Sequence, residues 1–315
     1  MRVNRVLLWL ATAAVVGGLS AGVGIAGKPV GGGGVDTGTV YFWLFGNQNR
    51  MWTMNPDGTS KTALPSVIPW RSVPSRAMHG GHRWFLYAAD DVFAVRDDGT
   101  GVVQLTTQAN LTSSSVQWAP GDASISWIAD GGVAGQEGVF VADTVFDGSG
   151  HLTGLDAQPS QAAVPLAGAA SHDWAPDGDR LVVGDTSWAL WIASLSSGAA
   201  SHLATAAPAG SPVWSPDGTL IAYQEGASKI HTIATDGTGD RTIVSVKGPS
   251  SQSVGDMAWS PNGTHLVYYK AGSAIRDERT DVYRATSSGG SKTNLTGDLD
   301  TRAMSGTPAY PLGWR

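Results

Sequence analysis

Trp214-Ser215-Pro216-Asp217-Gly218 is the stretch that decides the fold, because its pattern returns along the chain. Pro fixes φ, Asp caps the turn with its side chain and Gly takes the positive φ, so each copy predicts a strand ending in a tight turn. The intervals between successive tryptophans are 56, 40, 45 and 55 residues, near or just above the 40 to 50 or so typical of such repeats. The other copies are Trp118-Ala119-Pro120-Gly121-Asp122, Trp174-Ala175-Pro176-Asp177-Gly178, Trp259-Ser260-Pro261-Asn262-Gly263 and a short copy, Trp314-Arg315.

Residues 211–244 show what one repeat unit contains. A short apolar strand over 212–214 precedes the turn, and an almost wholly apolar strand over 220–223 follows it. A third strand over 229–233 alternates polar and apolar residues, and a fourth covers 241–244. Four antiparallel strands per unit, repeated radially, predict an all-β chain folded as a β-propeller.

One unit lacks the tryptophan. When Tyr87 is aligned with Tyr223, Met78 falls at the position of Trp214, and His79-Gly80-Gly81-His82 replaces the usual turn. The sequence therefore predicts six blades, whose inner strands carry a residue that packs between blades. These structural repeat residues are Met78, Trp118, Trp174, Trp214, Trp259 and Trp314.

The two ends of the propeller sequence complement each other. Two aromatic strand signals, at 40–44 and 51–54, precede the first full repeat and lack an inner strand. Residues 311–314 resemble an inner strand with no blade after it. We therefore expect the C-terminal strand to join the N-terminal blade and close the ring, which removes the exposed sheet edges of an open array.

The repeat resembles that of the TolB-type, WD-repeat-like propellers of bacterial envelope and secreted proteins. The resemblance covers residues 39–315, which leaves no room for the α/β domain that precedes the propeller in TolB itself. It implies a six-bladed ring, an extracytoplasmic location and a ligand site where the loops that enter the inner strands converge. Propellers of this type also occur in peptidases, lyases and scaffolds.

The N-terminus predicts export. Arg2 and Arg5 precede an uncharged stretch, so residues 1–26 are expected to be a signal peptide, or an uncleaved membrane anchor, followed by a Gly-rich linker at 27–38. Cleavage would remove two of the 20 basic and none of the 26 acidic side chains and shift the formal net charge from −6 to −8. This charge argues against a nucleic acid partner. Without cysteine, the chain has no disulfides, thiolate metal sites or thiol nucleophile.

Residues one to three places before each repeat residue are expected to lie near the mouth of the central channel. The members that vary between blades are the candidates for binding a ligand or partner: Arg76, Gln117, His172, Asp173 and Asp256. His172 and Asp173 resemble a base and its orienting carboxylate, but adjacent strand residues point to opposite faces. We therefore expect no catalytic dyad from them.

Two functions remain open. The first is a non-enzymatic binding scaffold for an envelope or extracellular protein, or for a saccharide, with membrane contact only through an uncleaved leader. The second is a polysaccharide-acting lyase or hydrolase with its site at the channel mouth. The seven histidines are scattered over the repeats, and His79 with His82 lacks an adjacent third metal ligand. We expect binding rather than catalysis, and no metal or cofactor.

Overall fold

The structure, a computed structural model, describes most of the chain from residue 37 onward. The predicted leader at 1–26 and all but the end of the predicted linker lie outside the described residues. No helix in the described part of the chain is long and apolar enough to cross a membrane. The described residues are 37–44, 50–107, 110–129, 137–159, 162–203, 205, 208–246, 253–271, 280–299 and 309–314.

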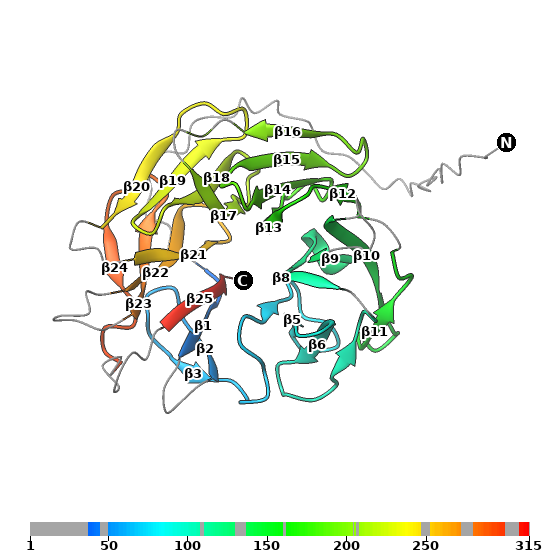
Figure 1. The fold of residues 1–315 in the computed structure, drawn as a ribbon. Coiled ribbons are helices and arrows are strands. Elements are labelled where there is room, and N and C mark those ends of the chain that lie inside the picture. Colours follow the sequence, from blue (N-terminus) through cyan, green and yellow to red (C-terminus); the bar gives the residue numbers. More distant parts are fainter. Residues whose placement is uncertain are drawn as a thin grey trace, which may run out of the picture. The chain divides into compact units, whose positions relative to one another are not determined.

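Within these residues, six antiparallel sheets of at least four strands form a ring, which confirms the predicted six-bladed propeller (Figure 1). Blade 1 contains β25 (Ala309–Trp314), β1 (Val40–Leu44), β2 (Arg50–Met54) and β3 (Thr62–Ala63). Blade 2 contains β4 (Val73–Pro74), β5 (Trp84–Ala88), β6 (Val92–Arg96) and β7 (Val103–Gln104). Blade 3 contains β8 (Leu111–Trp118), β9 (Ser124–Ala129), β10 (Gly138–Phe146), β11 (Leu152–Leu155) and the added β12 (Val164–Pro165).

The remaining three blades follow one another along the chain. Blade 4 contains β13 (Ala169–Trp174), β14 (Arg180–Asp185), β15 (Leu190–Ser194) and β16 (Ala200–Leu203). Blade 5 contains β17 (Ala209–Trp214), β18 (Leu220–Glu225), β19 (Lys229–Ala234) and β20 (Arg241–Ser245). Blade 6 contains β21 (Ser253–Trp259), β22 (His265–Ala271), β23 (Thr280–Thr286) and β24 (Lys292–Asn294).

The ring closes as predicted, by pairing the last strand with the first. In Figure 1 β25 lies beside β1, and the register pairs Val40 with Trp314 and Leu44 with Ala309. The Trp314 indole N–H donates to the backbone oxygen of Thr37 at 2.9 Å. Both chain ends therefore hold blade 1 together.

Among the described residues the hydrophobic core forms six clusters, each between two neighbouring blades. Each repeat tryptophan belongs to one cluster and is 1–6% exposed. The cluster between blades 1 and 2 has no repeat tryptophan and instead packs Tyr41 and Trp43 against Phe85. The Tyr41 and Phe85 ring centroids are 5.7 Å apart in an edge-on contact. Aromatic residues of β1 thus replace the missing tryptophan of blade 2.

The assignment of Met78 to the tryptophan position is wrong. Trp214 pairs with Ile221 in blade 5, and the equivalent pair in blade 2 is Pro74 with Phe85. Met78 lies outside the strands and is 51% exposed. The cause is that the connection between β4 and β5 is longer than the equivalent connection in blade 5. Counting back from the second strand by the length found in blade 5 therefore ends at Met78, inside this connection, and not at Pro74.

Candidate functional site

A cavity of about 320 Å³, here called the central cavity, lies where all six blades meet. Its walls include the ends of the inner strands and the turns that follow them. It therefore lies at the face where the inner strands end, and its lining includes residues one to three places before the repeat tryptophans. The lining residues are Val73, Arg76, Gln117, Asp173, Trp174, Pro176, Val213, Trp214, Ser215, Pro216, Met257, Ala258, Trp259, Ser260, Pro261, Gly313 and Trp314.

Three of the five candidate residues line this cavity: Arg76, Gln117 and Asp173. Arg76 follows β4, and its backbone N–H donates to Asp122 Oδ1 at 2.8 Å. The next backbone N–H, of Ala77, donates to Asp122 Oδ2 at 2.7 Å. The Asp122 carboxylate is fully buried, so it anchors the backbone from which the Arg76 side chain extends.

The carboxylate in the cavity lining, Asp173, already has a donor from the neighbouring blade. Asp173 Oδ2 accepts the backbone N–H of Trp214 at 2.7 Å. Gln117 lies one residue before the end of β8 and pairs across the sheet with Ser126. The cavity thus combines one cation, one amide and one hydrogen-bonded carboxylate with tryptophan and proline walls.

His172 does not line the cavity. It is 2% exposed, with Ser115 Oγ 3.0 Å from Nδ1 and Ser126 Oγ 2.6 Å from Nε2. Trp174 Nε1 donates to the same Ser126 oxygen at 2.7 Å. Burial lowers the pKa of His172 to about 3, so the ring is neutral and links blades 3 and 4. Its neighbour Asp173 points to blade 5, as the alternation of a strand requires.

Asp256 also lies outside the cavity lining. It sits in an irregular stretch of β21 between Gly255 and Ala258, with φ of 38°. Burial raises the pKa of its carboxyl, and the positive charge of Arg71 opposes that shift. Burial also raises the pKa of Tyr269, and the negative charge of Asp256 adds to this rise. Asp256, Arg71 and Tyr269 therefore form a second polar group, separate from the residues that line the cavity.

The His79-Gly80-Gly81-His82 turn is an interblade contact, not a shared metal site. His79 Nε2 lies 3.0 Å from Asp122 Oδ2, and its ring stacks on Phe146 at 4.2 Å. His82 Nδ1 instead lies 2.9 Å from Asp97 Oδ1. The two rings thus pair with separate carboxylates in different blades.

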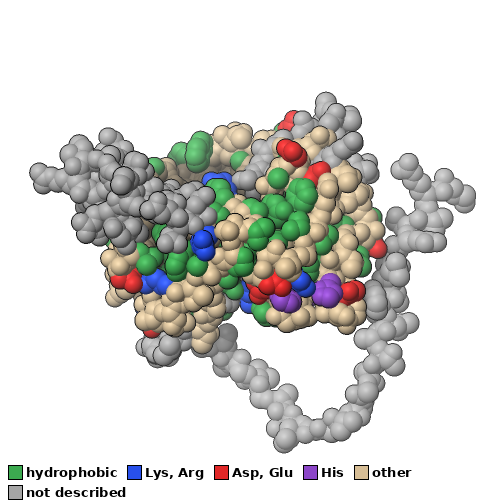
Figure 2. Space-filling model, turned by 90° about the horizontal axis from the view of Figure 1, so that it is seen from below, with side chains coloured by type: hydrophobic (Ala, Val, Ile, Leu, Met, Phe, Trp, Pro, Cys, Tyr) green, Lys and Arg blue, Asp and Glu red, His purple; other side chains and the backbone are tan. Residues whose placement is uncertain are grey.

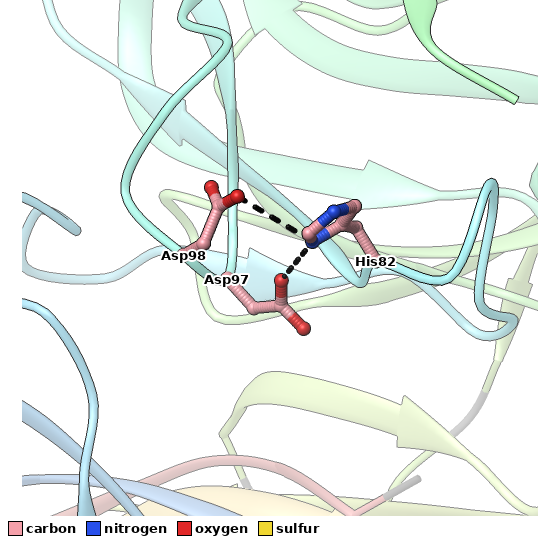
Figure 3. A group of neighbouring side chains, drawn as sticks. All are labelled: His82, Asp97 and Asp98. Carbon is pink, nitrogen blue, oxygen red and sulfur yellow. Dashed lines mark hydrogen bonds and ion pairs between the residues drawn. The ribbon is translucent and has the colours of Figure 1, made fainter. Parts of the chain in front are cut away.

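Among the described residues, His82, Asp97 and Asp98 form a group with potential metal-ligand atoms within 4.8 Å of one another (Figure 3). Sequence reasoning missed this group because it looked for a third ligand next to His79 and His82, whereas Asp97 and Asp98 lie after β6. Asp98 Oδ1 accepts the Thr100 N–H at 2.8 Å, and Asp98 Oδ2 is 3.4 Å from the Arg96 guanidinium. The group has the donor set of a divalent cation site, but the chain's own donors already satisfy its carboxylates.

A second histidine network was also missed by the sequence analysis. His231 Nε2 lies 2.7 Å from Glu225 Oε2, and Nδ1 lies 3.0 Å from Asp240 Oδ1. The Tyr223 hydroxyl donates to Asp240 Oδ2 at 2.6 Å. His231 is 7% exposed, so this network fixes the interior of blade 5. Tyr223 and Glu225 lie in β18, His231 lies in β19 and Asp240 directly precedes β20, so no short motif predicts the network.

Hydrophobic, histidine and acidic side chains are also exposed on one side of the ring (Figure 2). Hydrophobic side chains gather across the middle of that view, and histidine and acidic side chains lie together along its lower edge. Val67 and Val102 are 51% and 55% exposed, so the blades also present apolar side chains outside the cavity.

No protein-family model and no curated protein sequence matches the chain. Solved structures that match include oligogalacturonate lyase from Vibrio parahaemolyticus, at 13% identity and a TM-score of 0.47 over 81% of this chain and 71% of that one. Oligogalacturonate lyase in complex with manganese matches at 14% identity and 0.47, over 82% and 74%. Tricorn protease matches at 15% identity and 0.40, over 86% and 28%. The identities and TM-scores of these matches are low, so the assignment of the chain as a six-bladed propeller rests on its own six sheets.

Proposed function

We propose that the chain is an extracytoplasmic, TolB-type binding module that holds a ligand, or a segment of a partner, in its central cavity without chemical conversion. The observation that carries this proposal is the convergence of Arg76, Gln117 and Trp214 on one small cavity from three blades. Ligand sites combine an apolar wall with a few polar groups that fix orientation, and this cavity has that composition. The predicted leader supports export, and the net charge of −6 supports a partner other than nucleic acid.

The chemistry of the cavity favours binding over catalysis. No histidine belongs to the cavity lining described above, and Asp173 already accepts a backbone N–H. His172, the nearest histidine in sequence, is neutral and enclosed between two serines. General acid–base catalysis needs a titratable group within reach of the reacting atoms, and the carboxylate in the cavity lining, Asp173, already accepts a backbone N–H.

A photoreactive aliphatic residue placed at Val213 tests the proposal in the full chain. Val213 lines the cavity, whereas Val102 on the outside is 55% exposed and serves as the matched control. Irradiation with an envelope extract should give a defined adduct from position 213 that Arg76→Ala removes, and none from position 102. Equal adducts at both positions, or none at 213, would contradict the proposal.

The alternative is a polysaccharide-acting lyase or hydrolase, and the Asp256 group is the observation in its favour. A carboxyl and a phenol whose pKa values are raised by burial, near an arginine, are groups that acid–base catalysis uses. The full chain would be incubated with acidic polysaccharides while ultraviolet absorbance reports elimination and reducing ends report hydrolysis. Turnover that Asp256→Asn abolishes would establish the enzyme and displace the binding proposal.

A further inference from the structure

Among the described residues, Trp214 differs from the other four repeat tryptophans, whose indole N–H groups all donate a hydrogen bond. The indole N–H of Trp118 donates to the Val73 oxygen, and that of Trp259 to the Val213 oxygen, each at 3.1 Å. Each acceptor lies one residue before the equivalent position in the preceding blade. Trp214 is 4% exposed, and its indole N–H has no hydrogen-bond partner among the described residues. The cavity-lining residue Trp214 therefore carries a buried indole N–H that has no acceptor among the described residues.

Arg76 brings a positive charge to the same cavity, whose lining also includes the Asp173 carboxylate. In the described part of the chain its guanidinium makes no ion pair, and its buried Nε has no hydrogen-bond partner. The nearby cavity carboxylate, Asp173, accepts the Trp214 backbone N–H instead. Asp122 fixes the Arg76 backbone through two N–H groups at 2.8 and 2.7 Å. The backbone that carries Arg76 is thus fixed, and its guanidinium makes no ion pair with the described residues.

The rest of the wall makes these donors selective. Gln117 adds a side-chain amide from a third blade, while Val73, Val213 and Met257 are apolar. Hydrogen bonds to an ionised group are stronger where the surroundings exclude water. A guanidinium presents parallel N–H groups that match two oxygens of a carboxylate or of a tetrahedral anion. Among the described residues, the single cation in this wall matches a singly charged carboxylate better than doubly charged sulfate.

We infer that the central cavity recognises the carboxylate of a small ligand, with Arg76, Gln117 and the Trp214 indole N–H as its donors. This inference rests on the proposed binding function and names the chemistry of its ligand. A cavity of about 320 Å³ is at the small end of ligand pockets, so it accepts a single sugar ring or a short peptide terminus. An acidic sugar and a peptide C-terminus share this chemistry.

Calorimetric titration of the full chain distinguishes the two sources. D-Glucuronate is compared with D-glucose, and acetyl-alanyl-alanine with its C-terminal amide. At least one acid should bind at least about tenfold more tightly than its neutral counterpart, the difference expected for a charge-assisted pair. Sulfate should bind more weakly than that acid.

Variants then assign the donors. Arg76→Ala should weaken binding of that acid at least about tenfold, and Arg76→Lys should restore part of it. Trp214→Phe keeps an aromatic ring but removes the indole N–H, so it should weaken the acid severalfold and leave the neutral counterpart unchanged. Val102→Ala, outside the cavity, is the control, and thermal unfolding checks that every variant folds.

The outcomes distinguish the carboxylate inference from the binding function on which it rests. Equal binding of acid and neutral counterpart, equal binding of sulfate, an unaltered Arg76→Ala variant, or no binding of any acid overturns the carboxylate inference. The binding function itself then depends on the adduct at position 213. A cavity adduct without acid binding leaves that function standing, whereas loss of both removes the function as well.

Discussion

The Asp173 carboxylate of blade 4 accepts the backbone N–H of Trp214 in blade 5 at 2.7 Å. One blade therefore supplies an acceptor that the inner strand of the next blade needs. Trp214 belongs to the cluster between these two blades, so the hydrogen bond and the apolar contact act at the same interface. This relationship makes Asp173 a structural residue as well as part of the cavity wall.

Removing that acceptor should destabilise the propeller. Asp173→Ala leaves a largely buried N–H without its acceptor and should lower the free energy of unfolding by about 1–3 kcal/mol. Asp173→Asn keeps a side-chain oxygen and should cost less. Urea unfolding of both variants measures this difference. Equal losses for Ala and Asn would show that the side-chain oxygen is not the acceptor that matters.

Acid should weaken the fold through His172. The pKa of His172 is about 3 in the folded protein, against an ordinary value of 6.5. Between pH 6.5 and pH 3 the unfolded chain therefore binds a proton at this ring and the folded chain does not. Its contribution is therefore complete above pH 6.5 and is lost progressively as the pH falls toward 3. From pH 6.5 to 5 this amounts to about 2 kcal/mol, at about 1.4 kcal/mol per pH unit.

Urea unfolding at pH 7 and pH 5 tests this dependence. His172→Gln should show a smaller loss between the two pH values than the parent chain. The half-exposed His151 is the matched control, and His151→Gln should retain the parent dependence. A His172→Gln variant whose loss on acidification equals that of the parent would contradict the assignment.

Ring closure should depend on Trp314 far more than its place near the end of the sequence suggests. Trp314 is 1% exposed and packs between blades 1 and 6, so Trp314→Ala should lower the free energy of unfolding by about 3–5 kcal/mol. Trp188 is 56% exposed, and Trp188→Ala should cost less than about 1 kcal/mol. Thermal unfolding compares the two variants. Similar melting temperatures would argue against the closed blade 1.

The two glycines of the unusual turn should respond differently to alanine. Both have positive φ, 58° at Gly80 and 82° at Gly81, so backbone strain costs about 1 kcal/mol in each. A Cβ at Gly80 would lie 2.2 Å from the Ser149 oxygen, whereas one at Gly81 meets nothing within 4 Å. Gly80→Ala should therefore cost at least about 2 kcal/mol more, measured by urea unfolding. Equal costs would mean that this turn does not pack against blade 3.

The fold was predictable because its signal is local and repeated. Each turn of the Asp217-Gly218 type ends an inner strand, and Gly218 has φ of 75° as its turn requires. The closure was predictable because the unpaired strand signals at the two ends complete one blade. Met78 was misplaced because the connection in blade 2 is longer than in the other blades, and a sequence alignment cannot show where extra residues enter.

The site was only partly predictable. Position relative to the repeat tryptophan identified Arg76, Gln117 and Asp173 as channel residues, since every inner strand reaches the axis. It did not distinguish side chains that face the cavity from those that face a neighbouring blade, which is why His172 was included. The unpaired indole of Trp214 depends on the distance between two blades, and nothing in the sequence encodes that distance locally.

The pairing of β25 with β1 also means that blade 1 is completed last during synthesis of the chain. Trp314 donates a hydrogen bond to Thr37, 277 positions earlier, so β1 cannot pair with β25 until the intervening residues have been synthesised. Contacts this distant in sequence form slowly. Until then the backbone groups on the outer edge of β1 are unpaired and can bind the β25 strand of another molecule. Expression at high protein concentration therefore favours strand-exchanged dimers.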